Sequence, residues 1–323
     1  MKNISFLCFF VLVSCLLGCD NTVQQKGLEY VPFSENPVTI TWKGETAKVE
    51  SYQANVHVFT MNNRTDTHAT LSQSYRLAIS TIRDRVHTRI DFEQDADIPF
   101  RSVISDGDET IIFDPSTEEI AYRVQSEDSQ SPLYRVFSQQ TSMSRVNLSL
   151  IRNEAMRLSI RMREENDGDN KTLLLELPPD LLPKYGNDTI ISSRVSFDVT
   201  TETLLESEVV MKLEDDTIVT TTVTPVYEES NGVPVKIGQV TVIDSKAPGL
   251  IEGVDPDIPI YNSLDDLPLV SEAELENNGN AGDVVSIIFG NPADLSYVET
   301  IYEVYQEIEI NSAPDQLFRL IQK

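Results

Sequence analysis

Alternation of apolar and polar residues with a period of two is the feature that most constrains the fold of this chain. It begins with Val38, Ile40 and Trp42, which alternate with threonines, and it returns in run after run over the next two hundred or so residues. Successive side chains of a β-strand point to opposite faces, so each run predicts a strand with one buried face. Turn residues such as Asp106-Gly107 and Asn231-Gly232 separate the runs. The sequence therefore predicts a large antiparallel sheet.

Two stretches depart from this pattern. Ser131 before Pro132 is typical of a helix start, and apolar residues at helical spacing follow as far as residue 158, which predicts one or two short helices. After residue 245, prolines and acidic residues cluster, and Ala293–Tyr305 and Asp315–Ile321 are predicted to be helices. We expect this C-terminal piece to be a linker and a small α/β cap or extension.

The N-terminus has the features of an export signal. Lys2 precedes an uncharged apolar run, Ile4–Leu17, of about fourteen residues. A membrane-spanning helix needs roughly 20 apolar residues. The run is therefore more typical of a cleaved signal peptide than of a permanent span.

The run ends in Leu16-Leu17-Gly18-Cys19, which resembles the bacterial lipobox. The resemblance implies cleavage between Gly18 and Cys19 and attachment of a diacylglycerol to the Cys19 sulfur. Asp20 resembles the residue that retains some lipoproteins in the inner membrane. An ordinary signal peptide stays open as the alternative, because Cys8 and Cys15 show that cysteine is not rare in this segment.

Charge and cysteine content exclude several kinds of protein. The net charge is −27, and removal of residues 1–18, which contain Lys2 and no acidic residue, makes it −28. Such a surface repels nucleic acid, so we expect no nucleic-acid partner. All three cysteines lie at or before Cys19, so the mature body has no disulfide, zinc–thiolate site or cysteine nucleophile.

Motifs of known catalytic or cofactor chemistry are absent from the sequence. It contains no Gly-x-Ser-x-Gly elbow, no His-Glu-x-x-His and no phosphate-binding or dinucleotide loop. His57, His68 and His87 have no acidic partner at motif spacing, and we interpret them as surface or edge residues. The acidic stretches 106–109 and 167–170 are interpreted as turns and not as calcium loops, because calcium requires six to eight oxygen ligands. We therefore assign no catalytic residue, no metal and no cofactor, and we expect a protein that is not an enzyme.

The order of strands, helices and strands, together with several short motifs, resembles a known family. The motifs are Ser105-Asp106-Gly107-Asp108-Glu109-Thr110-Ile111-Ile112-Phe113-Asp114-Pro115, Leu173-Leu174-Leu175-Glu176-Leu177-Pro178, Val195-Ser196-Phe197-Asp198 and Asn231-Gly232-Val233-Pro234-Val235. Over residues 38–245 the chain is similar to the periplasmic lipoprotein-sorting carriers and receptors (LolA and LolB) and their relatives. The chain departs from the family in its long C-terminal piece. Which of Arg76, Arg83, Arg85 and Arg89 matches the arginine characteristic of the family stays open.

The resemblance implies a mainly β (α+β) fold. It would be a half-open antiparallel β-barrel or strongly curved sheet, with short helices over the open side and an apolar cavity for acyl chains or a lipidated peptide. The residues agree, because a curved sheet that helices only partly cover leaves an apolar pocket on its inner side. The candidates for the cavity lining are Phe59, Tyr75, Phe92, Phe113, Tyr122 and Phe197. For any single one of them, ordinary core is the favoured interpretation.

We therefore expect a signal peptide at 1–18, a lipid anchor and tether at 19–37, a carrier-like β domain at 38–245 and the C-terminal piece at 246–323. The predicted function is that of a lipoprotein of the cell envelope, facing the periplasm or the exterior, that binds an acyl chain, a lipid or a lipoprotein anchor. An envelope sensor or scaffold that binds another protein is the alternative, and a hydrolase is a third hypothesis.

Overall fold

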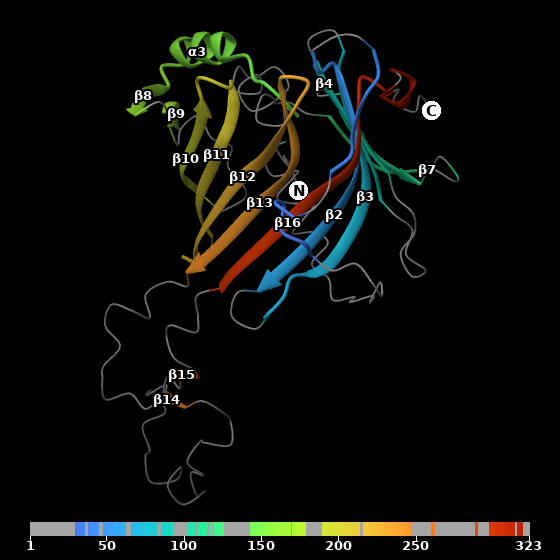
Figure 1. Ribbon diagram of the computed structural model, residues 1–323. Helices are drawn as coiled ribbons and strands as arrows, with labels where there is room; N and C mark the ends of the chain where they lie inside the picture. Colours follow the sequence, from blue (N-terminus) through green and yellow to red (C-terminus); the bar gives the residue numbers. More distant parts are fainter. Residues whose placement is uncertain are drawn as a thin grey trace, which may run out of the picture.

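The structure is a computed structural model, shown as a ribbon in Figure 1. It describes residues 30–35, 38–44, 48–62, 66–82, 85–92, 102–106, 109–114, 117, 119–125, 143–168, 170–178, 189–213, 216–246, 260–261, 288–289, 297–313 and 315–318. The predicted signal peptide and Cys19, the predicted site of lipid attachment, lie outside these residues.

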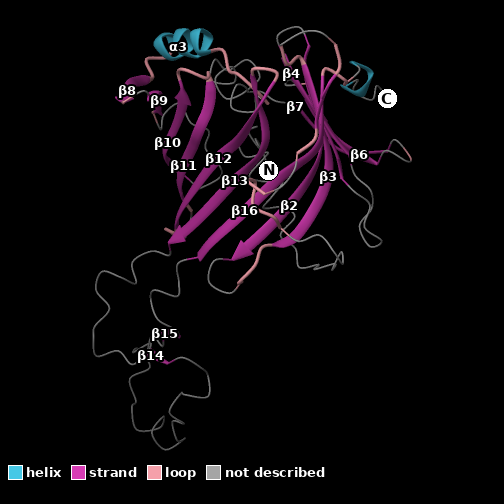
Figure 2. Cartoon of the chain, viewed as in Figure 1, coloured by secondary structure: helices cyan, strands magenta, loops and turns pink. Residues whose placement is uncertain are grey.

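One sheet, almost entirely antiparallel, forms the body of the protein, and Figure 2 shows how strongly strands outweigh helices. One half of it consists of β2 (Ser51–Asn62), β3 (Thr70–Ile82), β4 (Arg85–Phe92), β5 (Ser102–Ser105), β6 (Glu109–Asp114) and β7 (Glu119–Gln125). The other half consists of β8 (Arg161–Asp167), β9 (Asn170–Leu177), β10 (Thr189–Asp198), β11 (Thr203–Lys212), β12 (Ile218–Ser230) and β13 (Val233–Lys246). A separate parallel pair joins β14 (Ile260–Tyr261) to β15 (Ile288–Phe289).

The sheet is strongly curved but not closed. Its two ends are β7 and β8, neither of which pairs with a further strand among the described residues (Figure 1). The α-helix α3 (Leu148–Arg157) falls within the predicted helical stretch, whose first part, 131–142, lies outside the described residues. The Asn147 side chain caps this helix by accepting a hydrogen bond of 2.9 Å from the Leu150 amide. The expected fold class, a curved antiparallel sheet with a short helix, is confirmed.

The prediction for the C-terminal piece was wrong in one respect. Residues expected to be helical form β16 (Tyr297–Ile310), which lies between β2 and β13 in the middle of the sheet. The boundary expected at residue 245 separates two strands of the same sheet. Ser245 of β13 lies opposite Tyr297 of β16, so the two strands pair with each other. Of the second predicted helix, a single 3-10 turn, η5 (Asp315–Phe318), is described.

The first strand completes the centre of the sheet. β1 (Ile40–Trp42) pairs in parallel with Ile308–Ile310 of β16, just beyond the point where the pairing of β16 with β13 ends. The Trp42 indole N–H donates a hydrogen bond of 3.0 Å to the Ser230 hydroxyl at the end of β12. β1 therefore takes the place of β13 as the pairing partner of β16 beyond the point where β13 and β16 separate.

Part of the predicted tether also belongs to the body. The Tyr30 ring centroid lies 4.3 Å from that of Tyr302 and 5.6 Å from that of Phe59. Phe33 packs against the main hydrophobic cluster. The docked part of the chain thus begins at least eight residues before the position 38 expected from the sequence.

The register divides the side chains of the sheet into two faces, because residues opposite one another in paired strands point the same way. We call the face that carries Tyr52, Leu77 and Tyr305 the inner face. The inner face continues to Val195 and Phe197, as the paired residues of β16, β13, β12, β11 and β10 show when they are followed from strand to strand. We call the opposite side the outer face.

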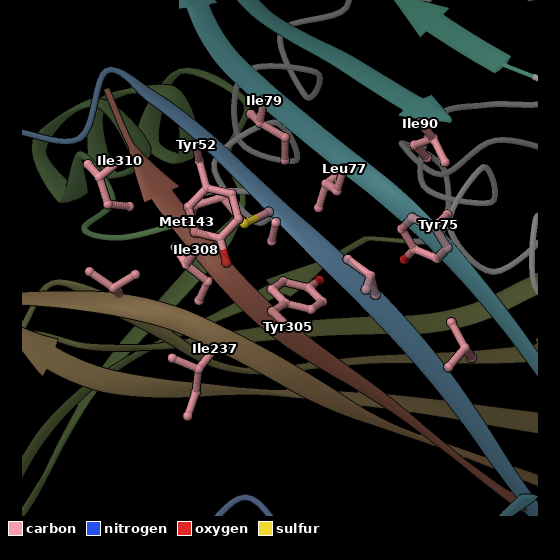
Figure 3. Close-up of a cluster of buried hydrophobic side chains, with 14 of the residues drawn as sticks. Tyr52, Tyr75, Leu77, Ile79, Ile90, Met143, Ile237, Tyr305, Ile308 and Ile310 are labelled. Carbon is pink, nitrogen blue, oxygen red and sulfur yellow. The ribbon is translucent and has the colours of Figure 1, made fainter. Parts of the chain in front are cut away.

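Two hydrophobic clusters occupy the inner face. The first centres on β2, β3 and β16 and includes Tyr52, Leu77 and Tyr305 (Figure 3). The second lies under α3, where Ile151 and Ala155 pack with residues of β9 and β10 such as Leu175 and Phe197. Burying these side chains, each worth roughly 1.5–3 kcal/mol when fully buried, holds the two halves of the sheet.

Candidate functional site

A group of buried polar side chains lies within the first hydrophobic cluster. The Lys236 ammonium donates a hydrogen bond of 2.7 Å to Gln239 Oε1, and Gln239 Nε2 donates one of 2.9 Å to Glu303 Oε1. Glu303 Oε2 accepts hydrogen bonds from the hydroxyls of Tyr75 at 3.2 Å and Tyr305 at 3.1 Å. We call these five residues the polar cluster. It joins β13, β16 and β3 across the inner face.

The backbone around Lys236 explains how a lysine comes to lie there. The register of β12 and β13 shifts between Val226 and Tyr227, so that Lys236 lies opposite Tyr227. Its amide donates a hydrogen bond to the Met143 carbonyl at 2.9 Å, and its carbonyl accepts one from the Tyr52 hydroxyl at 2.8 Å. This end of β13 is thus fixed from two sides, and its lysine is directed into the cluster.

Burial governs the ionisation of these groups. Desolvation, opposed by the charge of Glu303, lowers the pKa of Lys236 from 10.5 to about 8. Burial also raises the pKa of Tyr52, Tyr75 and Tyr305 well above the usual value of 10. The three hydroxyls therefore keep their protons in the folded protein and act as hydrogen-bond donors.

The inner face is less buried between the two clusters. On either side of this region, Val56, Tyr305 and Val195 are fully buried. Between them, on β11, β12 and β13, five inward-facing apolar side chains are only half-buried: Val209, Met211, Val219, Val223 and Ile243. We call these five residues the central strip.

The structure separates the six predicted cavity residues. Tyr75, Phe92 and Phe197 lie on the inner face, and the rings of Tyr75 and Phe92 are 5.8 Å apart. Phe59 lies on the outer face under Tyr30, and Phe113 lies there in a small cluster with Ile104 and Ile111. Tyr122, on the edge strand β7, is 50% exposed. That these residues line a cavity stays a prediction.

Two of the four candidate arginines lie on the outer face. Arg76 donates a hydrogen bond to the Gln53 side chain at 3.4 Å. Arg89 pairs with Asp91 at 2.9 Å and donates to the Leu317 carbonyl, which holds η5 against β4. Neither reaches the inner face, while Arg83 and the side chain of Arg85 lie outside the described part.

The histidines have ordinary surroundings where they are described. His57 Nδ1 lies 2.8 Å from the Ser74 hydroxyl, and the His87 ring packs edge-on against Phe318. In the described residues, no group of three or more acidic, histidine or cysteine side chains is placed to hold a metal ion. Asp106 Oδ1 accepts a hydrogen bond from the Glu109 amide, as expected for a turn.

In the part of the chain that the structure describes, no helix is long and apolar enough to cross a membrane.

Sequence reasoning missed Lys236, Gln239 and Glu303. Lys236 and Gln239 stand in a strand where polar and apolar residues alternate, and a polar residue in such a pattern is normally assigned to the solvent face. Glu303 stands in a stretch that was predicted to be a helix. The bulge that turns Lys236 inward depends on pairing with Tyr227, which no local pattern reveals.

No family model and no curated protein matches this sequence. Among solved structures, the chain is similar to a LolA superfamily protein, NE2245 from Nitrosomonas europaea, with 14% identity and a TM-score of 0.38, covering 84% of this chain and 90% of that one. It is also similar to MucB in its complex with MucA(peri), with 10% identity and a TM-score of 0.21, covering 82% of this chain and 94% of that one. Both scores are low, and no residue role passes from those proteins to this one.

Proposed function

We propose that this protein is a lipid-anchored binding protein of the cell envelope that takes the acyl chain of a hydrophobic ligand along the central strip. The observation that carries the proposal is the fall in burial between the two clusters of the inner face. The strip is apolar, it is open enough to gain from further burial, and buried apolar side chains border it on both sides. Such a surface gains roughly 25 cal/mol for each Å² of apolar area that a ligand covers.

Binding is proposed in preference to catalysis because the acidic group of the polar cluster, the Glu303 carboxylate, is already engaged as a hydrogen-bond acceptor by neighbouring side chains. Glu303 accepts three donors, and the tyrosine hydroxyls are used as donors to it. No nucleophile lies beside a base in the described polar cluster. The location in the envelope and the lipid on Cys19 rest on the lipobox resemblance of the N-terminus.

A matched pair of substitutions tests the proposed site. Val209 points to the inner face and Val210 to the outer face, and both are half-buried residues of β11. We expect Val209→Asp to weaken binding of a fluorescent long-chain fatty acid by about tenfold or more, and Val210→Asp to leave binding within about twofold, with both variants folded by circular dichroism. Equal losses in the two variants would overturn the site, and the absence of binding to the unaltered protein would overturn the function.

A second candidate function is recognition of a protein partner, and the open sheet edges favour it. Among the described strands, β7 and β8 end the sheet, and an extended peptide can add to such an edge as a further strand. β8 has a largely exposed, charged sequence, whereas β7 exposes Tyr122. Crosslinking in intact cells that captured an envelope protein at β7, together with the absence of any acyl ligand, would favour this function over the first.

A further inference from the structure

The two charged members of the polar cluster are unequally satisfied. Glu303 accepts hydrogen bonds from Gln239, Tyr75 and Tyr305. The Lys236 ammonium carries three N–H donors, but Gln239 Oε1 is the one acceptor that it meets among the residues that the structure describes. Its other close neighbour is the Tyr305 ring, whose centroid lies 5.6 Å away.

This asymmetry is not what a purely structural ion pair requires. A buried ammonium is costly unless it is paired and fully hydrogen-bonded, and the direct partner for it would be the carboxylate. Here Gln239 stands between the two charges, and Lys236 is only 4% exposed. The lowered pKa of Lys236 agrees with a cation that the protein itself compensates poorly.

The polar cluster also lies at one end of the central strip. Along β13, the inward-facing residues that follow Gln239 are Thr241, Ile243 and Ser245. Six residues of β-strand span roughly 20 Å at about 3.3 Å per residue. An acyl chain placed along the strip would therefore have one end beside Gln239 and the Lys236 ammonium, and its other end towards Ser245.

We propose that Lys236 binds an acceptor oxygen at the head of the acyl ligand, either a carboxylate or an ester carbonyl, while the chain lies on the central strip. The inference rests on the proposed function and adds the chemistry of the ligand's head to it. Gln239 positions the ammonium, and Glu303 with its two tyrosines holds Gln239.

The test compares three probes on the purified protein. N-phenyl-1-naphthylamine, an apolar fluorophore without an oxygen acceptor, reports occupation of the strip, and palmitate and monopalmitoylglycerol compete with it. In Lys236→Met we expect the fluorophore to bind within about twofold of the unaltered protein, while palmitate competes about tenfold more weakly. Lys246→Met is the matched control, because Lys246 is an exposed lysine of the same strand, and it should change neither value. Lys236→Arg keeps the charge, should retain the preference for palmitate, and provides a test if Lys236→Met does not fold.

Each outcome decides the proposal. Weaker competition by palmitate alone supports a carboxylate head, and weaker competition by both lipids supports a carbonyl acceptor that they share. If Lys236→Met leaves both lipids unchanged, or weakens the fluorophore to the same extent, Lys236 is not an anchor, although the strip still binds ligand. If the unaltered protein binds none of the three probes, the anchor and the proposed function fail together.

Discussion

The ring of Phe33 lies against the backbone of Gly238, so close that a Cβ atom at Gly238 would stand 2.3 Å from Phe33 Cε1. The same Cβ would stand 2.4 Å from the Glu303 carbonyl oxygen. Gly238 is the last residue of β13 opposite β16 before β1 enters between them. The N-terminal segment therefore docks on the outer face, at the point where β13 and β16 stop pairing.

Gly238→Ala should destabilise the protein for this reason. The added methyl group overpacks a site bounded by backbone on one side, and overpacking costs about 1–3 kcal/mol or more. Urea denaturation followed by the fluorescence of Trp42 measures the change. Adding Phe33→Ala to Gly238→Ala should recover only part of the loss, because the clash with the Glu303 carbonyl remains. Unaltered stability of the single variant would contradict this packing.

The stability of the protein should depend on pH through Lys236. Its pKa is lowered to about 8 in the folded state from 10.5, so above about pH 8 the unfolded chain binds more protons than the folded one, and stability rises with pH. The titratable groups around Lys236 are Glu303 and the hydroxyls of Tyr52, Tyr75, Tyr227 and Tyr305, and burial raises the pKa of Tyr227 as well. The raised pKa values of the tyrosines remove stability only above about pH 10, where unfolded tyrosines ionise.

Thermal unfolding between about pH 7 and about pH 9.5 measures this dependence. Relative to Lys236→Met, the unaltered protein should gain stability across this window. Lys246→Met should follow the unaltered protein, because the Lys246 side chain is exposed. Parallel curves for the unaltered protein and Lys236→Met would show that burial does not shift this lysine.

The sequence allowed most of the strands, but not β16, to be predicted. In β16, Val298, Ile301, Tyr302 and Tyr305 have the i, i+3, i+4, i+7 spacing of an amphipathic helix. The strand is central and buried on both faces, as the low exposure of Ile301 and Val304 shows, so its alternation is lost. The strand forms only because it pairs with β2 and β13. Even β13, the nearer of the two in sequence, ends more than fifty residues before β16 begins.

The face on which each predicted cavity residue lies also depends on strand pairing, so the sequence predicted it for only some of them. Tyr75 and Phe92 lie together on the inner face because they stand opposite each other in β3 and β4. Phe59 and Phe113 lie beside register shifts, where composition gives no indication of the face. The polar cluster was not predicted, since three strands distant in sequence have to meet before its hydrogen bonds exist.

Lipid attachment at Cys19 remains a prediction of the lipobox resemblance and has its own test. Cells grown with a radiolabelled or alkyne-tagged palmitate should label the protein, and Cys19→Ala should abolish the label and leave an uncleaved precursor. Cys15→Ala is the matched control, because Cys15 lies in the same segment but before the expected cleavage position. A label that persists in Cys19→Ala would refute attachment at that residue.

Photocrosslinking tests the central claim most directly. A fatty acid with a diazirine in its chain, added to the purified protein and irradiated, should modify Val209, Met211, Val219 or Val223, the central strip residues of β11 and β12. Peptide mass spectrometry reads the adducts. The account also predicts that an excess of unmodified fatty acid suppresses these adducts. Adducts confined to the outer face, for example at Val210 or Val242, or to the edge strands β7 and β8, would contradict the claim that the inner face of the sheet is the ligand site.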